Sequence, residues 1–445
     1  MGKKIGIVSL GCAKNQVDSE MMLAKAVRAG YEITQDVALA DAIIVNTCAF
    51  IDAAKQEAIE NILEMAQFKK EGKCRGLIVT GCLPERYQEE IMTQLPEVDA
   101  VLGTGSYLKI AEALDEVLAG NPYRDFGDQE QAPISASRVL TTPFYTAYLR
   151  IAEGCDNHCA YCTIPSIRGG FRSRPAEEIL REAAHLVDTG VKEVILVAQD
   201  TTRYGKDLYG AYRLPQLLEQ IAAFEQIHWI RIHYMYPDLV SDELIECIAA
   251  NEKILPYFDI PIQHASDNML QAMNRRGTRK ELISLFERIK TRIPEATLRT
   301  TVIAGFPGES KEDFEELLSF VRRVQFDKLG AFAYSREEGT VGYDLPGQIA
   351  EPLKDKRVEI LLSEQAKISL KKNRMKKGRT IEVLTEGYDL LAGCYFGRSA
   401  ADSLDVDGKV FFKAPKGSIA EGAFVPVKIT GFEDYDLYGE ISKID

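Results

Sequence analysis

Short apolar segments alternate with longer segments of helical spacing over most of this 445-residue chain, and this alternation restricts the fold more than any other feature. In the first part of the chain, the apolar segments are residues 5–10, 42–46, 76–80 and 100–102. Strands that are apolar throughout and joined by helices are typical of a parallel sheet with helices on its faces. We therefore predict an α/β domain with a parallel sheet over residues 1–135.

The alternation resumes after a stretch rich in Gly, Pro, Gln and Asp at residues 120–143, which we interpret as an interdomain linker. Six further apolar segments follow, at residues 147–152, 193–198, 229–234, 257–260, 298–303 and 329–334. Six strand–helix units in a row predict an open, partial (β/α)6 barrel over residues 141–350. In such barrels, functional side chains gather at the carboxyl ends of the strands.

The last part of the chain has a different pattern. A charged segment of helical spacing covers residues 352–377, and five short β-like segments separated by turns follow it. So many short strands in so few residues predict a small antiparallel β-barrel of the oligonucleotide-binding style over residues 376–445. The overall expectation is an α/β protein of three domains.

Composition and charge narrow the class of protein. No apolar run is long enough to span a bilayer, and residues 5–10 lack the features of a secretory signal, so we expect a cytoplasmic protein without membrane contact. The formal net charge is −13, which argues against a surface that binds nucleic acid throughout, and we expect no stable nucleic-acid binding. The nine cysteines of a chain in a reducing compartment indicate metal or redox chemistry more than disulfides.

Three of these cysteines, Cys155, Cys159 and Cys162, form a Cys-x3-Cys-x2-Cys triplet directly after the first strand of the expected barrel. Three thiolates so close in sequence can bind three irons of a four-iron cluster and leave the fourth iron open for chemistry. The alternatives are a zinc site completed by His158, or three buried cysteines. His158 lies inside the triplet, which is unfavourable for tetrahedral closure around zinc.

Three more cysteines each follow a strand of the first expected sheet. Cys12, Cys48 and Cys82 would all project from the edge where open parallel sheets bind ligands. Gly11 and Gly81 precede two of them and would let the backbone approach a bulky group. We interpret the three thiols as ligands of a second cluster, the alternative being three separately buried cysteines. The remaining cysteines are interpreted as structural, namely Cys74, Cys247 and Cys394.

The first triplet is the signature of the radical S-adenosylmethionine (SAM) enzymes, and two triplets followed by a small β-barrel resemble the methylthiotransferase family. The resemblance covers nearly the whole chain, as a methylthiotransferase domain, a radical SAM domain and a TRAM domain. It implies two 4Fe-4S clusters, a SAM-binding one on the first triplet and an auxiliary one on the second. The segment SLGCAKNQVDSE at residues 9–20 is similar to the RimO-type branch, in which Pro is usual at the position of Ala13. That branch modifies an aspartate of a small-subunit ribosomal protein.

The resemblance also implies which residues surround SAM. They lie beside the first triplet or at the strand ends of the expected barrel, and they are Tyr161, Gln199, Asp200, Arg231, His233, Gly305 and Glu309. Taken alone, His233 is more typical of a hydrogen-bonded structural histidine, and Gln199 and Asp200 fit either role. The basic loop at residues 168–174 is expected either to bind a substrate acid or the SAM carboxylate, or to be a solvated loop.

The expected reaction is methylthiolation of an aspartate β-carbon. This C–H bond is too weakly acidic for a side-chain base tuned near neutral pH, so a radical derived from SAM is the available route. The resemblance implies that a second SAM methylates sulfur attached to the auxiliary cluster. It also implies an electron donor such as flavodoxin or ferredoxin.

The charge of the last segment bears on the substrate. Residues 376–445 contain nine Lys and Arg and twelve Asp and Glu, a net charge of −3. A barrel that binds tRNA needs a basic face, whereas an acidic barrel is complementary to a basic partner such as a ribosomal protein, free or in the ribosome. A merely solvated acidic surface is the alternative. We therefore expect a ribosomal-protein substrate, and the rival hypotheses are a tRNA adenosine methylthiotransferase and a non-catalytic iron–sulfur module.

Overall fold

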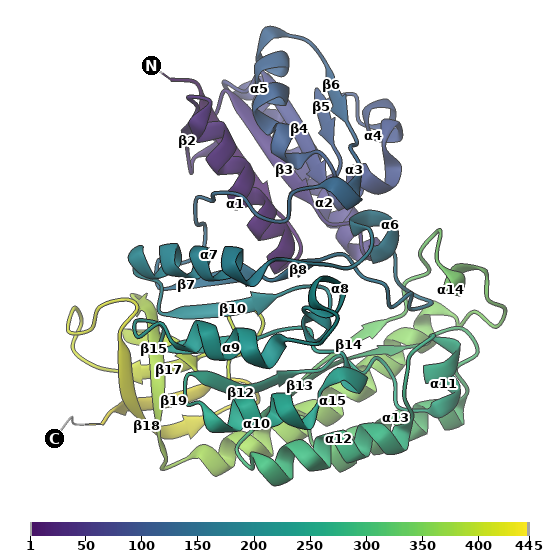
Figure 1. Cartoon of the computed structure of the whole chain (residues 1–445), viewed down its shortest axis with the longest axis vertical. Helices are drawn as coiled ribbons and strands as arrows, with labels where there is room; N and C mark the ends of the chain where they lie inside the picture. Colours follow the sequence, from purple (N-terminus) through teal and green to yellow (C-terminus); the bar gives the residue numbers. More distant parts are fainter. Residues whose placement is uncertain (1, 443–445) are drawn as a thin grey trace.

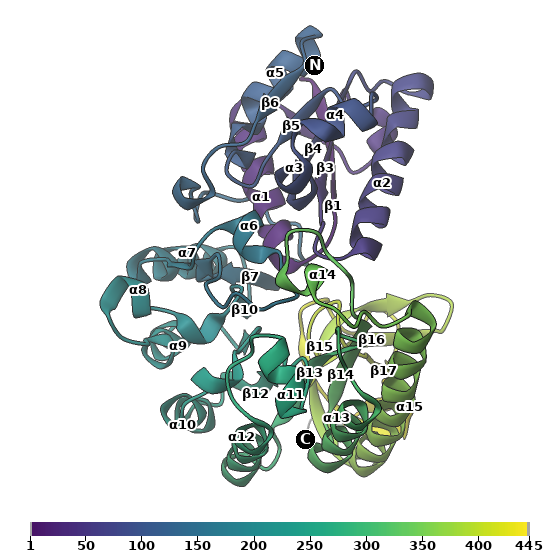
Figure 2. The ribbon, with the colours of Figure 1, turned by 90° about the vertical axis from the view of Figure 1, so that its right-hand side faces the viewer.

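The computed structural model describes residues 2–442, so the outer ends of the first and third expected domains, Met1 and residues 443–445, lie outside the described residues. An α/β unit built from the first third of the chain lies at one end of the long axis, and a second sheet with its helices lies below it (Figure 1). A closed β-barrel packs beside the second sheet (Figures 1 and 2). Between residues 2 and 442, no helix has the length and apolar character that a membrane span requires.

The first sheet consists of six parallel strands. They are β1 (Lys4–Ser9), β2 (Glu32–Ile33), β3 (Ala42–Thr47), β4 (Gly76–Gly81), β5 (Ala100–Leu102) and β6 (Tyr123–Asp125), in the order β2-β1-β3-β4-β5-β6. The helices are α1 (Ala13–Arg28), α2 (Asp52–Glu71), α3 (Cys82–Tyr87), α4 (Glu89–Gln94) and α5 (Ile110–Ala119). The central strands β3 and β4 are buried at every position, which explains their apolar sequence. The edge strands β2 and β6 are two and three residues long with no buried position, so they leave no apolar run in the sequence.

Helices cover both faces of this sheet. Side chains of α1 and α5 share one apolar core with the sheet, and side chains of α2 share another core on the opposite face. The predicted parallel α/β sheet is confirmed, and its strands end toward the second sheet (Figure 1).

The second sheet also has six parallel strands, in sequence order from one edge to the other. They are β7 (Thr146–Arg150), β10 (Glu193–Val197), β11 (Trp229–Ile232), β12 (Ile254–Asp259), β13 (Thr297–Ala304) and β14 (Lys328–Ala333). The helices around them are α7 (Ala176–Asp188), α8 (Lys206–Tyr209), α9 (Leu214–Ala222), α10 (Asp242–Ala250), α11 (Asp267–Ala272), α12 (Arg279–Arg292) and α13 (Lys311–Val324). Because β7 and β14 do not pair with each other, the sheet is an open half-barrel, as predicted.

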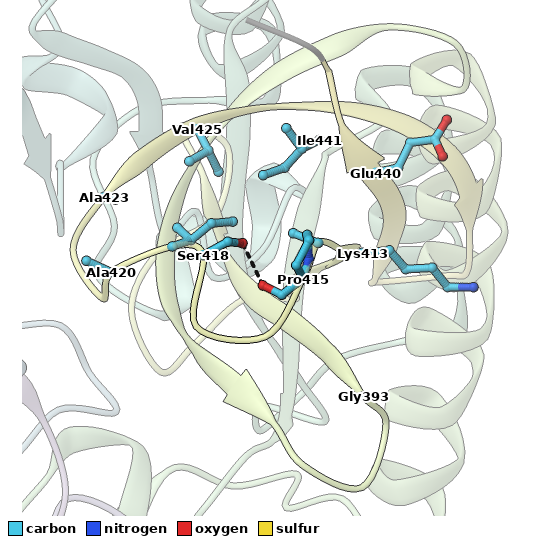
Figure 3. A pocket seen from close by; sticks show the side chains of 11 residues that line it. Gly393, Lys413, Pro415, Ser418, Ala420, Ala423, Val425, Glu440 and Ile441 are labelled. Atoms are coloured by element: carbon cyan, nitrogen blue, oxygen red, sulfur yellow. Dashed lines mark hydrogen bonds between the residues drawn. The ribbon is translucent and has the colours of Figure 1, made fainter.

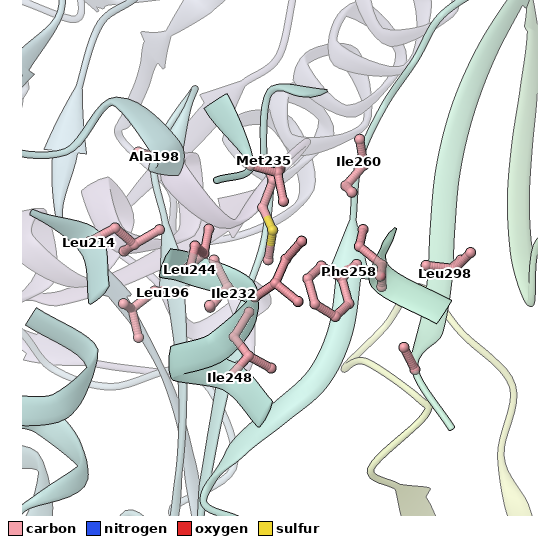
Figure 4. Close-up of a cluster of buried hydrophobic side chains, with 14 of the residues drawn as sticks. Leu196, Ala198, Leu214, Ile232, Met235, Leu244, Ile248, Phe258, Ile260 and Leu298 are labelled. Atoms are coloured by element: carbon pink, nitrogen blue, oxygen red, sulfur yellow. The ribbon is translucent and has the colours of Figure 1, made fainter. Parts of the chain in front are cut away.

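The main core lies between the half-barrel and its helices. Leu196, Ile232, Phe258 and Leu298 point outward from successive strands into it, and Leu244 of α10 meets them there (Figure 4). Alternate residues of the same strands point to the concave side, where they meet other parts of the chain. Near the first strand, β8 (Ala152–Glu153) and β9 (Arg172–Ser173) form a small antiparallel pair that brackets α6 (Ile164–Arg168).

The third part begins after a short helix, α14 (Val341–Asp344), with the long helix α15 (Glu351–Lys376). This helix runs along β14, and its Leu361 and Ile368 belong to the main core. The barrel that follows has the strands β15 (Thr380–Asp389), β16 (Cys394–Ser399), β17 (Val410–Lys413), β18 (Phe424–Phe432) and β19 (Leu437–Ile441). It closes in the order β15-β16-β17-β19-β18. Four of its pairings are antiparallel, as predicted, but β17 pairs with β19 in parallel because β18 lies between them in sequence and not in space.

One barrel segment leaves the barrel and enters the concave side of the half-barrel. We call this segment, which joins β16 to β17, the inserted loop (residues 400–409). Its Ser403 Oγ lies 2.7 Å from His233 Nε2, and its Asp407 accepts a hydrogen bond of 2.6 Å from the Tyr257 hydroxyl. Its Leu404 is buried in the core that also contains Tyr148, which faces inward from β7. The concave side is therefore packed with protein.

Candidate functional site

The first cysteine triplet lies in a tight loop between β8 and α6. The amide of Cys155 donates to the Gly169 carbonyl over 3.1 Å, and the amide of Cys162 donates to the Cys159 carbonyl over 3.0 Å. Gly154 has φ +77°, and a Cβ there would lie 1.9 Å from the Gly170 oxygen, so only glycine fits this bend. The loop thus folds back on itself and gathers the three thiols.

The environment of these thiols suits a polynuclear metal group. Burial raises the pKa of Cys155 to about 11, and burial and the neighbouring Cys159 also raise the pKa of Cys162. Buried thiols that oppose one another's ionisation are converted to thiolates by metal binding. Within residues 2–442, no three His, Cys, Asp or Glu side chains lie close enough to bind one metal ion, and His158 is exposed. A zinc site with His158 is therefore not supported, whereas in a cluster each thiolate binds a separate iron.

The second triplet gathers at three neighbouring strand ends. Cys12 precedes α1 after β1, Cys48 follows β3, and Cys82 begins α3 directly after β4. A Cβ on Gly11 would lie 2.6 Å from Cys48 Cβ, so this glycine lets two strand ends touch. Burial raises the pKa of Cys48 to about 12, with Cys82 and Cys12 adding to the effect. The three thiols therefore lie near one another at one edge of the sheet, as expected for ligands of a shared group.

A chain of buried charges connects the two triplets across the domain boundary. Asp18 of α1 accepts hydrogen bonds from Arg150 and from Arg168, both at 2.6 Å. Arg150 also pairs with Glu153 at 2.8 Å. Arg168 Nη2 lies 3.8 Å from Cys82 Sγ. Burial alone would raise the pKa of Glu153, but Arg168 and Arg150 hold it below its ordinary value. This ion-pair network thus joins α1 of the first domain to the end of β7, to β8 and to α6 of the second.

The basic loop at residues 168–174 is neither solvated nor open to a ligand. Arg168 belongs to the network just described, and Arg174 pairs with Glu182 at 2.7 Å. Arg172 donates to the carbonyl oxygens of Gln129 and Ala132 in the interdomain linker. The arginines of this loop hold domains and linker together, which corrects both expectations for it.

Three of the expected SAM-binding residues lie beside the first triplet. Tyr161 packs in a small apolar cluster next to Cys159 and Cys162. Asp200 accepts a hydrogen bond of 3.0 Å from Asn157, which lies inside the triplet loop, and burial raises its pKa. Gln199 donates to Glu153 over 2.5 Å, while its buried Oε1 has no partner within residues 2–442. An orphaned acceptor of this kind fits a site built for a polar ligand.

The other four expected residues have protein partners. Arg231 pairs with Glu193 at 3.1 Å and donates to the Ala400 carbonyl of the inserted loop, and His233 meets the same loop. Both side chains therefore contact the inserted loop.

The turn after β13 contains the last two expected residues. Gly305 has φ +80°, and a Cβ there would lie 2.3 Å from Lys354 Cγ of α15, so the close approach at this glycine is to a helix of the chain itself. Glu309 accepts from the Phe306 amide at 3.2 Å and pairs with Arg357 at 3.0 Å. These contacts fix the turn against α15.

Two residues beside the cysteines have no signal in the sequence. Arg275 lies 3.8 Å from Cys159 Sγ, and its guanidinium is 4.0 Å from the ring centroid of Tyr236. Lys14 places its ammonium 3.6 Å from the ring centroid of Tyr234. Arg275 belongs to a loop after α11 rather than to a strand end, and Lys14 looks like any helix-surface lysine until the fold buries it.

A separate pocket of about 820 Å³ opens on the C-terminal barrel (Figure 3). Ala423, Val425 and Ile441 line it, and Ser418 Oγ donates to the Pro415 carbonyl at its rim over 2.6 Å. It contains no buried ionisable group and none of the six cysteines of the two triplets, so the chemistry lies elsewhere.

Three sequence families match the chain in succession. Residues 4–103 match the uncharacterized protein family UPF0004, residues 149–321 match the radical SAM superfamily, and residues 378–441 match the TRAM domain. The chain is 50% identical to the ribosomal protein uS12 methylthiotransferase RimO of Pelotomaculum thermopropionicum over 99% of both chains. It is 48% identical to the protein of the same name from Geobacter sulfurreducens, over 99% of this chain and 98% of that one.

Among solved structures, the chain is similar to the radical SAM methyltransferase TsrM from Kitasatospora setae with cobalamin and a [4Fe-4S] cluster bound. The TM-score is 0.56 at 11% identity, and the match covers 75% of each chain. A second structure of the same enzyme, with tryptophan and a SAM analogue bound, gives a TM-score of 0.54 at 10% identity over 87% of this chain and 79% of that one. At these identities the likeness concerns the fold.

Proposed function

Because the chain belongs to the family of ribosomal protein uS12 methylthiotransferases of the RimO type, we propose that it methylthiolates the β-carbon of an aspartate in uS12, a protein of the small ribosomal subunit. The observation that carries this proposal is the pairing of two thiol triplets, whose members are buried or half-buried, across one domain boundary. One triplet suffices to hold a SAM-binding cluster, whereas insertion of sulfur needs a second group facing the same substrate atom. We place the reaction in the cytoplasm, where ribosomes are found.

Two iron–sulfur clusters and SAM are the proposed cofactors. Cys155, Cys159 and Cys162 would hold the SAM-binding cluster, and the second triplet would hold the auxiliary cluster. When bound, these groups supply electron transfer to SAM, radical hydrogen abstraction and a site for sulfur. Tyr161 and Gln199 would border SAM, the latter through its unpaired Oε1.

The chain's own residues contribute charge, position and exclusion of water. Each triplet has one buried arginine 3.8 Å from a thiol sulfur, Arg275 at Cys159 and Arg168 at Cys82. A fixed positive charge at this distance favours the thiolate that metal binding requires. Asp18 fixes Arg168 through an ion pair of 2.6 Å, and the Pro261 carbonyl fixes Arg275 through a hydrogen bond of 2.6 Å, so both triplets keep one geometry while the buried boundary excludes water.

The rival substrate is a tRNA adenosine. A nucleic-acid substrate would need a basic surface on the C-terminal barrel, and the net charge of this segment is −3. We therefore propose the ribosomal protein or the intact ribosome as the partner, with flavodoxin or ferredoxin as the electron donor.

The test is anaerobic reconstitution of the enzyme with iron and sulfide, followed by parallel assays on ribosomes and on bulk tRNA. We expect a methylthio mass gain on uS12, mapped to one aspartate by peptide mass spectrometry, and 5′-deoxyadenosine as coproduct. A mass gain on tRNA alone would overturn the proposed substrate. Absence of 5′-deoxyadenosine under reducing conditions would overturn the radical chemistry.

A further inference from the structure

Among the residues that the structure describes, Lys14 is a buried cation without an ion-pair partner. It lies in the first turn of α1, two residues after Cys12, and only 7% of it is exposed. Within residues 2–442, its ammonium makes no hydrogen bond and no ion pair, and its one close polar contact is the face of the Tyr234 ring at 3.6 Å. A charge taken out of water is normally paired, because an unpaired buried ion is costly.

The neighbouring carboxylates already have partners. Glu153 pairs with Arg150 and accepts from Gln199, and Asp18 pairs with Arg150 and Arg168. Cys12 and Glu153 are the neighbouring groups whose negative charge acts on Lys14, and under the proposed function Cys12 would be a cluster ligand. A free anion that pairs directly with Lys14 would therefore come from outside the described chain. The region is further biased toward anions, because the first turn of α1 has no acidic residue and Cys12 makes no side-chain capping bond there.

Lys14 also has a defined place relative to the two domains. It starts beside Cys12 of the second triplet and reaches across the domain boundary to Tyr234, which follows β11 at the mouth of the half-barrel. Tyr234 in turn packs against the apolar cluster that contains Leu404 of the inserted loop. An anion bound by Lys14 would thus lie at the half-barrel mouth and next to the second triplet.

We infer that Lys14 binds the side-chain carboxylate of the target aspartate and so presents its β-carbon to the second cysteine triplet. This inference rests on the proposed function, since an aspartate substrate carries a carboxylate one bond from the reacting carbon. Lys14 would then determine the preference for an acidic side chain over a neutral one of the same shape.

The experiment uses reconstituted enzyme with free recombinant uS12 in two forms, one with the target aspartate and one with that aspartate changed to asparagine. Methylthio transfer is measured for the wild type, Lys14→Met and Lys14→Arg, with Lys25→Met near the other end of the same helix as control. For the wild type and Lys25→Met, we expect the asparagine form to react about 10- to 100-fold more slowly. Lys14→Met should lose a similar factor on the aspartate form and no longer distinguish the two forms, while Lys14→Arg should keep the preference.

The same variants separate this role from that of a counter-ion to the auxiliary cluster. We expect Lys14→Met to keep its iron content, the spectrum of its reduced clusters and its SAM cleavage in the absence of uS12. Loss of iron or a changed spectrum, or a Lys14→Met enzyme that still prefers aspartate, overturns the inference. If the wild type modifies only tRNA, the proposed function fails first, and the inference fails with it.

Discussion

The buried carboxylate of Asp18 shows how a single charged side chain can fix the relative position of the two triplets. Its two carboxylate oxygens accept from Arg150 and Arg168 at 2.6 Å, so one side chain of the first domain holds two side chains of the second. Removal of one partner from such a network leaves an uncompensated charge in a dry environment. The distance between the two triplets is therefore fixed by this packing, in which the linker takes part through the Ile134 carbonyl that accepts from Arg150.

Replacement of Cys12, Cys48 and Cys82 by alanine should separate the two chemical steps. Because these thiols lie on a different sheet from the first triplet, we expect SAM cleavage to persist while methylthio transfer is lost and about half of the bound iron disappears. Iron analysis and product assays provide the measurement. The matched control is Cys74→Ala, whose thiol donates to the Gly76 carbonyl and is buried at the end of β4 opposite to Cys82, so this variant should retain full iron. Undiminished iron in the triple variant would contradict the ligand assignment.

Some residues of the candidate site could be predicted from the sequence, and others could not. The cysteines could be found because their relation to one another or to a strand is local in sequence. Lys14 and Arg275 could not, because only the packing of distant segments brings them to Tyr234 and Cys159. Arg231 lies near the carboxyl end of a barrel strand, where functional side chains are expected. Its side chain nevertheless donates to the Ala400 carbonyl of the inserted loop on the concave side.

The inserted loop ties the C-terminal barrel to the catalytic half-barrel. Lys328 of β14 pairs with Asp402 at 2.7 Å, and Tyr257 of β12 donates to Asp407 at 2.6 Å, so strands from the middle and the edge of the sheet are engaged. The sequence indicated a β-barrel correctly, but a loop that leaves the barrel has no periodicity that would reveal its destination. Leu404 of the loop also belongs to the apolar cluster against which Tyr234, the ring below Lys14, is packed.

Leu404→Ala should weaken this attachment. Leu404 is 5% exposed, and truncation of a buried leucine leaves a cavity that costs about 2–5 kcal/mol. We expect a lower free energy of unfolding in urea, together with slower methylthio transfer because Tyr234 loses its support. Leu391→Ala is the matched control, since Leu391 is fully exposed in a turn of the same barrel and should change stability by less than about 0.5 kcal/mol. Equal effects of the two substitutions would show that the loop is not anchored in solution.

The net charge counted from the sequence of a domain is not the charge that its folded surface presents. Asp402, Asp407 and Glu386 contribute to the acidic count of residues 376–445, yet all three accept from or pair with buried or half-buried partners such as Lys328 and Arg398. The surface of the barrel is therefore less acidic than the count implies. The three domains and their order could be predicted because each has its own periodicity, whereas their interlocking depends on long-range pairs that leave no local pattern.

These interdomain pairs make the assembly sensitive to acid. Burial alone would raise the pKa of Glu193 in β10, but Arg398 of the barrel and Arg231 lower it to about 2. Burial would likewise raise the pKa of Asp402, but Lys328 and Lys376 lower it to about 2. A carboxyl group with a depressed pKa in the folded state stabilises that state above its ordinary pKa and loses this contribution as the pH falls toward the depressed value. The contribution should therefore be complete at neutral pH and decline between about pH 4.5 and pH 2.

Glu193→Gln isolates this effect, because it removes the titrating group while keeping its shape. In urea unfolding of the cluster-free protein, we expect the variant to be less stable than the wild type by about 3 kcal/mol near pH 6. The difference should shrink toward pH 3, because Glu193 of the unfolded wild type takes up a proton there while the folded protein does not. Glu89→Gln serves as control, since Glu89 pairs with Arg124 on the surface, with 68% and 61% of the two side chains exposed, and should change neither stability nor its slope with pH. A difference between wild type and Glu193→Gln that stays constant across this pH range would mean that Glu193 does not titrate with a depressed pKa, and that shape rather than charge holds the barrel in place.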